Sequence, residues 1–329
     1  MSFIAGIHLS IEQLINLQRE SNHFKHRRHS PVRSALAGNY RSRFKGRGMD
    51  FDEVRHYQPG DDIRSIDWRV TARTQQVHTK LFSEERERPV FLMIDQSASM
   101  FFGSQNTLKA VIGAATASIL LWSSLQRKDR IGGLLFDNDS HRELKPANSR
   151  KAALALLHQV VESHNRLVNQ LQESLAEPAA PPTHSTPSSF NENLERLRNL
   201  AHPGSTLCIF SDCLQFDETS SRHLATLAKH NDVTIYQIND PLDEKLPPLG
   251  VYPITDGFQH ALLDTRHAKS RAEFEAITEQ RNQRLKDCAT KHRIQHHRLS
   301  TSSGNTQRLF EFLKGHQSVI HRRSELFSS

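Results

Sequence analysis

The stretch PVFLMIDQSASM, Pro89 to Met100, decides the fold of this chain. Val90 to Ile94 is an unbroken apolar run, typical of a parallel strand that is buried on both faces. The run closes on a carboxylate, Asp95, and two hydroxyls follow at alternate positions, Ser97 and Ser99. At the carboxyl end of a strand, such a turn offers oxygen ligands to a hard cation such as Mg²⁺. These residues could instead cap the next helix, and the stretch alone leaves both interpretations open.

Strands and helices alternate after this stretch. We expect helices over 106–126, 149–172, 190–200 and 218–230, and strands over 130–136, 141–146, 205–210 and 233–238. This alternation predicts an α/β fold, a doubly wound, mostly parallel sheet with helices on both faces. A second carboxylate, Asp212, follows the strand at 205–210, so Asp95 and Asp212 are expected to meet at one edge of the sheet. Two strand-terminal aspartates with clustered hydroxyls favour the cation site over simple capping.

A small β-containing module is predicted upstream of this core. We expect strands over 49–57 and 77–85, a turn centred on Pro59 and Gly60, and one short helical stretch over about 62–73. Acidic residues and arginines alternate through the block GRGMDFDEVRHYQPGDDIRSIDWR, which indicates a network of ion pairs. This network could form a recognition surface or a structural clasp.

The remaining segments lie at the two ends of the chain. A short amphipathic helix is expected over 9–20, and after residue 240 we expect a hairpin turning at Asp256-Gly257, a long helix over 265–291, a strand near 294–300 and a helix near 306–314. The predicted organisation has four parts: an N-terminal helix and basic arm at 1–36, a β module at 37–88, an α/β core at 89–240, and a C-terminal part at 241–329 that completes the core.

Positive charge is concentrated in one segment. The net charge is +7, yet residues 19–47 carry nine Lys or Arg against one acid, a local charge of +8. Such a basic arm can contact nucleic acid, anionic lipid or an acidic protein surface, or it can be solvated without a dedicated partner. No nucleic-acid-binding motif accompanies the arm, so the sequence disfavours nucleic acid as its partner.

Other features predict a cytoplasmic protein. No run of residues is long and uncharged enough to cross a bilayer. The first residues, MSFIAGIHLSIEQL, lack the basic and apolar regions of a signal peptide. The three cysteines, Cys208, Cys213 and Cys288, form no CxxC pair, which indicates reduced thiols.

The ordered set of motifs resembles a known bacterial family, domain of unknown function 58, whose core is similar to a von Willebrand factor A domain. The resemblance covers roughly residues 35–315. It rests on the block at 46–69 and on four later motifs, VFLMIDQSASMFFG, DRIGGLLF, LCIFSDC and DPLDEKLP, in that order. The first block is very specific, and the ordered set is more specific still.

This resemblance implies a metal-ion-dependent adhesion site (MIDAS) that binds Mg²⁺ or Mn²⁺. Carried over residue by residue, the implied metal ligands are Asp95, Ser97, Ser99, Ser188 and Asp212. Ser188 stands for the threonine of a Gly-Gly-Thr-Asp loop, with Ser189 in place of the aspartate and Thr186 as a second candidate. The glycines of that loop are absent here, so the middle ligand departs from the family pattern.

The sequence favours a binding protein over an enzyme, because it contains no GxSxG elbow, HExxH motif, Walker A lysine or Cys–His signature. The resemblance implies a partner of a MoxR-type AAA ATPase that assists the assembly or maturation of a client protein. A carboxylate of another protein would then complete the coordination of the metal. Two alternatives remain, a metal-dependent hydrolase with Asp137 or Asp139 as the base, and a basic adaptor that binds nucleic acid or an anionic membrane through residues 19–47.

Overall fold

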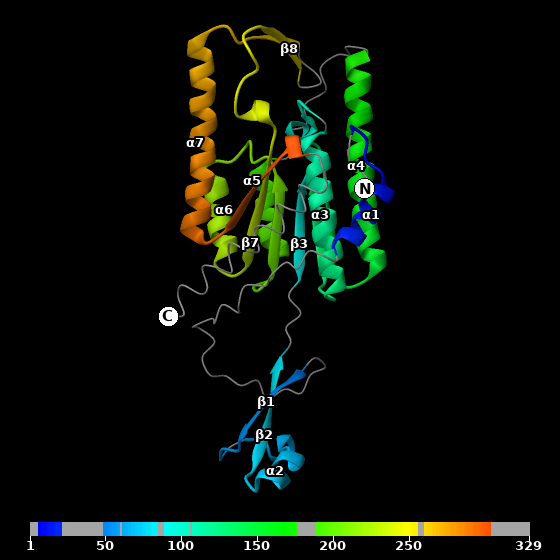
Figure 1. Cartoon of the computed structure of the whole chain (residues 1–329), viewed down its shortest axis with the longest axis vertical. Helices are drawn as coiled ribbons and strands as arrows, with labels where there is room; N and C mark the ends of the chain where they lie inside the picture. The colour runs from blue at the N-terminus through cyan, green and yellow to red at the C-terminus, as the bar shows by residue number, and fades with distance from the viewer. Residues whose placement is uncertain are drawn as a thin grey trace. The chain divides into compact units, whose positions relative to one another are not determined.

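The computed structural model (Figure 1) describes residues 6–21, 49–59, 61–84, 89–105, 107–176, 189–255 and 260–303. The chain forms two compact units, one of residues 29–87 and one that combines residues 1–28 with residues 88–329. In the larger unit, helices flank a six-stranded, mostly parallel sheet, which confirms the predicted α/β class. None of the helices in the described ranges is long and apolar enough to cross a membrane.

The central sheet has the strand order β10-β7-β6-β3-β4-β5. Its members are β3 (Val90–Asp95), β4 (Ile131–Phe136), β5 (His141–Ala147), β6 (Thr206–Ser211), β7 (Asp232–Asn239) and β10 (Gln295–Ser300). Neighbours pair in parallel, except that the edge strand β5 runs antiparallel to β4. All six strands were expected at nearly these bounds, because short apolar or alternating runs between turn residues are strong strand signals.

Helices cover both faces of this sheet (Figure 1). One face carries α1 (Ile11–Ser21), α3 (Lys109–Gln126) and α4 (Arg150–Ala176), and the other carries α5 (Phe190–Leu200), α6 (Glu218–Ala228) and α7 (Ala268–His292). Each of these corresponds to a helix expected from the sequence. The helix expected near 306–314 lies outside the described residues, as does most of the basic arm.

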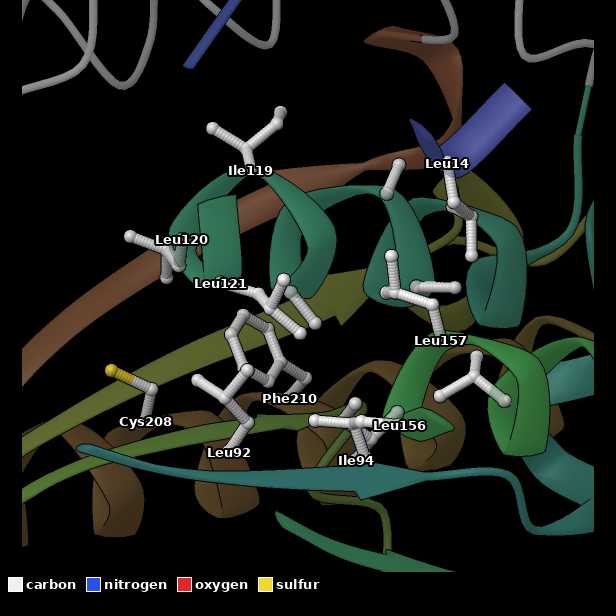
Figure 2. Packing of buried hydrophobic residues seen from close by; sticks show 14 of the residues in the cluster. Leu14, Leu92, Ile94, Ile119, Leu120, Leu121, Leu156, Leu157, Cys208 and Phe210 are labelled. Atoms are coloured by element: carbon white, nitrogen blue, oxygen red, sulfur yellow. The ribbon is translucent and has the colours of Figure 1, made fainter. Parts of the chain in front are cut away.

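Side chains of β3 alternate between two cores. Leu92 and Ile94 pack with α1, α3 and α4, whereas Phe91 and Met93 pack with α5, α6 and α7. Figure 2 shows Leu92 and Ile94 below α3, with Phe210 of β6 beside them. Successive strand residues point to opposite faces, and helices cover each face, so every residue of β3 is buried. This strand therefore holds Asp95 on a rigid support.

Close packing of β4 against α4 occurs at Gly133. A Cβ atom on Gly133 would lie 2.6 Å from Leu156 Cδ1. We expect Gly133→Ala to lower the free energy of unfolding by about 1–3 kcal/mol, because overpacking displaces the neighbours. Urea unfolding followed by circular dichroism measures this cost. Combined with Leu156→Ala, the change should cost less than the sum of both single variants, and strict additivity would contradict the close-packing explanation.

The smaller unit is built on an antiparallel pair, β1 (Met49–His56) and β2 (His78–Glu84), which confirms the two predicted strands. Between them lie a 3-10 turn, η1 (Ile63–Ser65), and a short helix, α2 (Trp68–Thr74). The prediction of one continuous helical stretch over 62–73 was wrong. Asp62 caps η1, but Asp67 accepts hydrogen bonds from Arg69 N and Val70 N and so begins a second helix.

Ion pairs in the smaller unit join its own elements. Arg55 on β1 contacts Asp61 at 2.7 Å, and Asp61 N donates to Gln58 O at 3.0 Å, as expected for the predicted turn at Pro59. Gly60, the other predicted turn residue, lies outside the described residues. Lys80 on β2 lies 3.5 Å from the carboxylate of Asp67. These contacts favour the structural clasp over a recognition surface.

After β7 the chain forms a 3-10 turn, η3 (Pro241–Asp243), and then the hairpin of β8 (Val251–Thr255) and β9 (His260–Asp264). The two strands pair antiparallel, with Thr255 opposite His260, which confirms the predicted hairpin. The predicted turn residues, Asp256 and Gly257, lie outside the described residues. A last 3-10 turn, η4 (Thr301–Ser303), follows β10.

Candidate metal centre

Asp95 and Asp212 meet where the strand order reverses. The chain leaves β3 towards β4 on one side and returns as β6 on the other, so β6 pairs with β3, with Ile94 opposite Phe210. Asp95 ends β3 and Asp212 directly follows β6. In doubly wound sheets such a switch point, at the carboxyl ends of the strands, is the usual ligand site. The expectation that these two aspartates share one edge of the sheet is confirmed.

The carboxylate of Asp95 is almost completely buried, with 4% of the residue exposed. One oxygen accepts a hydrogen bond from Ser97 N at 2.8 Å, and the other accepts one from Ser211 Oγ at 2.5 Å. Burial, and then the negative charge of Asp212, raises the pKa of Asp95 to about 6. These hydrogen bonds only partly offset the cost of the buried charge, which indicates a site that a cation would stabilise.

Ser97 and Ser99 lie beside Asp95 at the start of η2 (Ala98–Phe101), with their hydroxyl oxygens 3.3 Å apart. Together with Asp95 and Asp212 they line a cavity of about 10 Å³, room for a single water-sized sphere. The rest of the lining consists of Phe136, Phe190, Ser211, Leu214 and Gln215. Four of the five predicted ligands therefore converge on one small space.

The fifth predicted ligand, Ser188, and the second candidate, Thr186, lie outside the described residues. Ser189 is the N-cap of α5, and its hydroxyl accepts a hydrogen bond from Glu192 N at 3.2 Å. Phe190, the first residue of α5, lines the cavity, so the start of α5 lies at the candidate centre.

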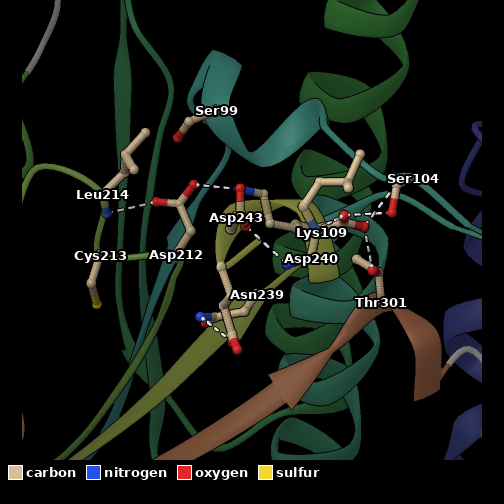
Figure 3. A network of polar contacts seen from close by, with 12 residues as sticks. Ser99, Ser104, Lys109, Asp212, Cys213, Leu214, Asn239, Asp240, Asp243 and Thr301 are labelled. Carbon is tan, nitrogen blue, oxygen red and sulfur yellow. Dashed lines mark hydrogen bonds and ion pairs between the residues drawn. The ribbon is translucent and has the colours of Figure 1, made fainter. Parts of the chain in front are cut away.

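Asp212 has a further partner that the sequence analysis missed. Its Oδ1 accepts a hydrogen bond from Leu214 N at 2.9 Å, and its Oδ2 lies 2.9 Å from the ammonium of Lys109. The same ammonium lies 2.9 Å from Asp243. Figure 3 shows the side chains of Lys109, Asp212 and Asp243 together. Burial alone would lower the pKa of Lys109, but the charges of Asp212 and Asp243 raise it above its ordinary value. Lys109 is therefore a buried cation next to the candidate centre.

Asp240 extends this network to β10 (Figure 3). Its carboxylate accepts hydrogen bonds from Ser104 N at 2.8 Å, from Ser104 Oγ and from Thr301 Oγ1, both at 2.5 Å. Burial would raise the pKa of Asp240, but these donors lower it. The loop after η2 is thus tied to the carboxyl ends of β7 and β10.

Asp137, a candidate base for hydrolysis, directly follows β4 and accepts hydrogen bonds within the turn that it begins. Its carboxylate accepts hydrogen bonds from Asp139 N at 3.0 Å and Ser140 N at 2.7 Å, and it forms an ion pair with Arg166 at 2.5 Å. These partners give Asp137 a structural role in the β4–β5 connection. The geometry gives the hydrolase alternative no activated base at this residue.

The donor set suits a hard cation. In the described ranges, no group of three or more His, Cys, Asp or Glu side chains is arranged to hold a metal. The candidate centre instead combines two carboxylates with serine hydroxyls, all oxygen donors of the kind that Mg²⁺ takes together with water. A carboxylate oxygen has more than one lone pair, so Asp95 and Asp212 can accept their present hydrogen bonds and still face a cation.

Comparison with known proteins identifies relatives of the chain. The model of the family "Protein of unknown function DUF58" matches residues 53–284. An uncharacterized protein of Mycobacterium tuberculosis H37Rv, Rv1480, is 26% identical over 221 residues, 67% of this chain and 64% of the relative. The uncharacterized protein YeaD of Bacillus subtilis is 37% identical over 75 residues, 20% of this chain and 19% of the relative. The chain thus spans 64% of the length of its mycobacterial relative.

Proposed function

The chain belongs to the DUF58 family, and from this membership and the geometry of the centre we propose a non-catalytic protein-interaction module that binds Mg²⁺ or Mn²⁺. The proposed site is a von Willebrand factor A-like MIDAS. The strongest support is the convergence of Asp95, Ser97, Ser99 and Asp212 on one small cavity at the switch point of the sheet. Ser188 is proposed as the middle ligand.

In this proposal, the chain's own oxygens hold the cation and leave part of its coordination to water or to a partner. When bound, the cation supplies a positive centre that an acidic side chain of another protein can approach. Asp95 and Asp212 contribute only two formal negative charges, so the cation keeps its affinity for a further carboxylate. The site thereby selects a partner with an exposed Asp or Glu.

The partner proposed from the family resemblance is a MoxR-type AAA ATPase, acting with a client protein in the cytoplasm. The exposed surface near the centre is compatible with a protein partner, because Leu214 and Phe102 are 44% and 42% exposed. Apolar side chains beside a charged centre are common in protein interfaces. The basic arm within residues 19–47 is a further proposed contact for an acidic surface of such a partner.

Binding of the metal alone tests the proposal. We expect isothermal titration of Mg²⁺ into the full chain to show one site, and Asp95→Ala to weaken binding at least tenfold, since it removes a carboxylate from the cavity. Mn²⁺, followed by its electron paramagnetic resonance signal, provides an independent measurement of the same loss.

The matched control is Asp287→Ala, which removes one aspartate from α7, away from the cavity lining. This control should bind Mg²⁺ like the wild type. Wild-type protein that takes up neither cation, or an Asp95→Ala variant with unchanged affinity, would refute the proposed function.

A further inference from the structure

Lys109 occupies an unusual position for a lysine. It is the first residue of α3, a helix whose residues from 109 to 124 are all buried, and its side chain is only 2% exposed. Lysine is rarely buried unless it is paired. The N-terminal end of a helix also carries a partial positive charge, which disfavours a cation there. The position of Lys109 therefore depends on the two carboxylates that it contacts.

These two carboxylates belong to different parts of the molecule. Asp212 lines the candidate metal cavity, whereas Asp243 lies in η3, beyond the end of β7. The ammonium is 2.9 Å from each of them. Asp243 is itself fixed, because the same oxygen accepts a hydrogen bond from Asp240 N at 2.8 Å. Lys109 thus has a second partner that is in place whether or not Asp212 binds a metal.

A divalent cation at Asp212 would meet the charge of Lys109. Like charges a few ångströms apart in a buried site repel strongly, because little water screens them. The cluster of Asp95, Asp212, Asp243 and Lys109 carries three negative charges and one positive charge. The ammonium of Lys109 forms an ion pair with Asp212, which is one of the proposed metal ligands.

We propose that Lys109 is a resident cation that limits the affinity of the centre for divalent metal by competing for Asp212, with Asp243 as its alternative partner. This inference rests on the proposed function. When metal binds, the ammonium shifts its interaction from Asp212 to Asp243, so the strength of the Asp243 contact sets how readily Asp212 is released. Lys109 is thus a residue that tunes affinity, and it is not itself a metal ligand.

Three variants of the full chain test this inference by isothermal titration of Mg²⁺. Lys109→Met keeps the length of the side chain and removes its charge, and should tighten binding at least tenfold. Asp243→Asn removes the charge of one of the two carboxylates that Lys109 contacts, so that only Asp212 remains as its ion-pair partner. This variant should weaken Mg²⁺ binding at least threefold. The double variant Lys109→Met/Asp243→Asn should bind Mg²⁺ more tightly than the wild type does. The cluster of residues 95, 109, 212 and 243 has the same net charge of −2 in both proteins, so net charge alone predicts no difference.

The double variant also addresses folding, because Lys109→Met alone leaves two buried carboxylates without their cation. Removing the charge of Asp243 relieves part of this cost, and circular dichroism establishes that each variant is folded before titration. Since the competition requires the lysine, Asp243→Asn should lose most of its effect in the Lys109→Met background. This loss of effect is the double-mutant signature of the pair.

The outcomes separate this inference from the proposed function. If the wild type binds Mg²⁺ and all variants match it, the inference is wrong and the proposed function stands. Weaker binding by Lys109→Met would assign the lysine to holding Asp212 in place and would also overturn the inference. If Mg²⁺ binds only after Lys109→Met, the inference holds and the proposed function of the wild type fails. Absence of binding in every variant would overturn both.

Discussion

Trp122→Ala is expected to lower the free energy of unfolding by about 3–5 kcal/mol, because truncation of a buried tryptophan removes apolar contacts and leaves a cavity. Trp122 is completely buried on α3. Its indole Nε1 donates a hydrogen bond to Leu14 O at 3.0 Å, and the guanidinium of Arg150 lies 5.1 Å from its ring centroid. One side chain thereby joins α1, α3 and α4. The variant should loosen α1 as well as the core.

The only other tryptophan supplies the matched control. Trp68 on α2 is 66% exposed, so Trp68→Ala should change the free energy of unfolding by less than about 0.5 kcal/mol. Trp122→Phe keeps an aromatic ring but loses the indole N–H, and should cost less than Trp122→Ala. In the wild type Ser118 Oγ also donates to Leu14 O, at 2.9 Å, and we expect this hydrogen bond to remain in Trp122→Phe.

Urea unfolding followed by far-ultraviolet circular dichroism measures the loss, and hydrogen exchange of the α1 amides reports the loosening of that helix. Faster exchange in Trp122→Ala, with native-like exchange in Trp68→Ala, is the expected pattern. Unchanged stability of Trp122→Ala would show that α1 and the core do not depend on this side chain.

The helix α1 also shows how far sequence reasoning reaches. Its bounds were expected, since Ser10 is a plausible N-cap and apolar residues recur along one face. In the structure, Ser10 and Gln13 form reciprocal hydrogen bonds at the start of the helix. Its position was not expected. Nothing local tells that the carbonyl of Leu14 accepts bonds from α3, more than a hundred residues away. Periodicity identifies an apolar face, but the surface that covers it depends on the tertiary fold.

Local sequence patterns also predicted the two aspartates of the candidate centre, but not the partners that they meet from distant parts of the chain. Parallel strands place their carboxyl ends together, so Asp95 and Asp212 could be paired from strand order alone. The contribution of Lys109 was missed, although a lysine at the start of the apolar run LKAVIGAATASILLW was a signal. An isolated lysine in such a run requires a buried anion. The anions that it meets, Asp212 and Asp243, lie after β6 and in η3, far from Lys109 in the sequence.

Asp240 and Asp243 belong to the segment around η3. The sequence DPLDEKLP is rich in proline and charge, a composition typical of a linker. The structure instead uses both aspartates as buried or half-buried acceptors that tie the strand ends together. Composition does not distinguish a solvated carboxylate from one that is directed inward, because the difference lies in partners from other parts of the chain.

Removal of the negative charge of Asp95 is expected to stabilise the metal-free protein at neutral pH. The folded chain raises the pKa of Asp95 from 3.8 to about 6, so the folded state binds a proton more tightly than the unfolded state does. The stability from this group is fully present below pH 3.8 and is lost as the pH rises through about 6. The loss is on the order of 3 kcal/mol.

Asp95→Asn removes this loss and keeps an oxygen that can accept the hydrogen bond of Ser97 N. Because Ser211 Oγ loses a charged acceptor, we expect a net gain of about 1–2 kcal/mol at pH 7.5, with little gain at pH 4. Asp212→Asn should have the opposite sign. It removes one of the two counter-charges of Lys109, and an incompletely paired buried cation should cost about 2–3 kcal/mol.

Urea unfolding of both variants in EDTA, at pH 4 and at pH 7.5, separates the contributions of the two carboxylates to stability. If Asp95→Asn raises the free energy of unfolding, and does so more at pH 7.5 than at pH 4, the negative charge of Asp95 destabilises the folded chain. If Asp212→Asn lowers the free energy of unfolding, the charge of Asp212 is already balanced by Lys109. Saturating Mg²⁺ should then raise the free energy of unfolding of the wild type at pH 7.5, because a ligand that binds only the folded state stabilises it. In Mg²⁺ the wild type should therefore be more stable than Asp95→Asn, the reverse of the order in EDTA. If Asp95→Asn destabilises the metal-free chain at pH 7.5, the buried charge of Asp95 is not the source of strain at this centre, and its hydrogen bonds with Ser97 and Ser211 outweigh the cost of burying it.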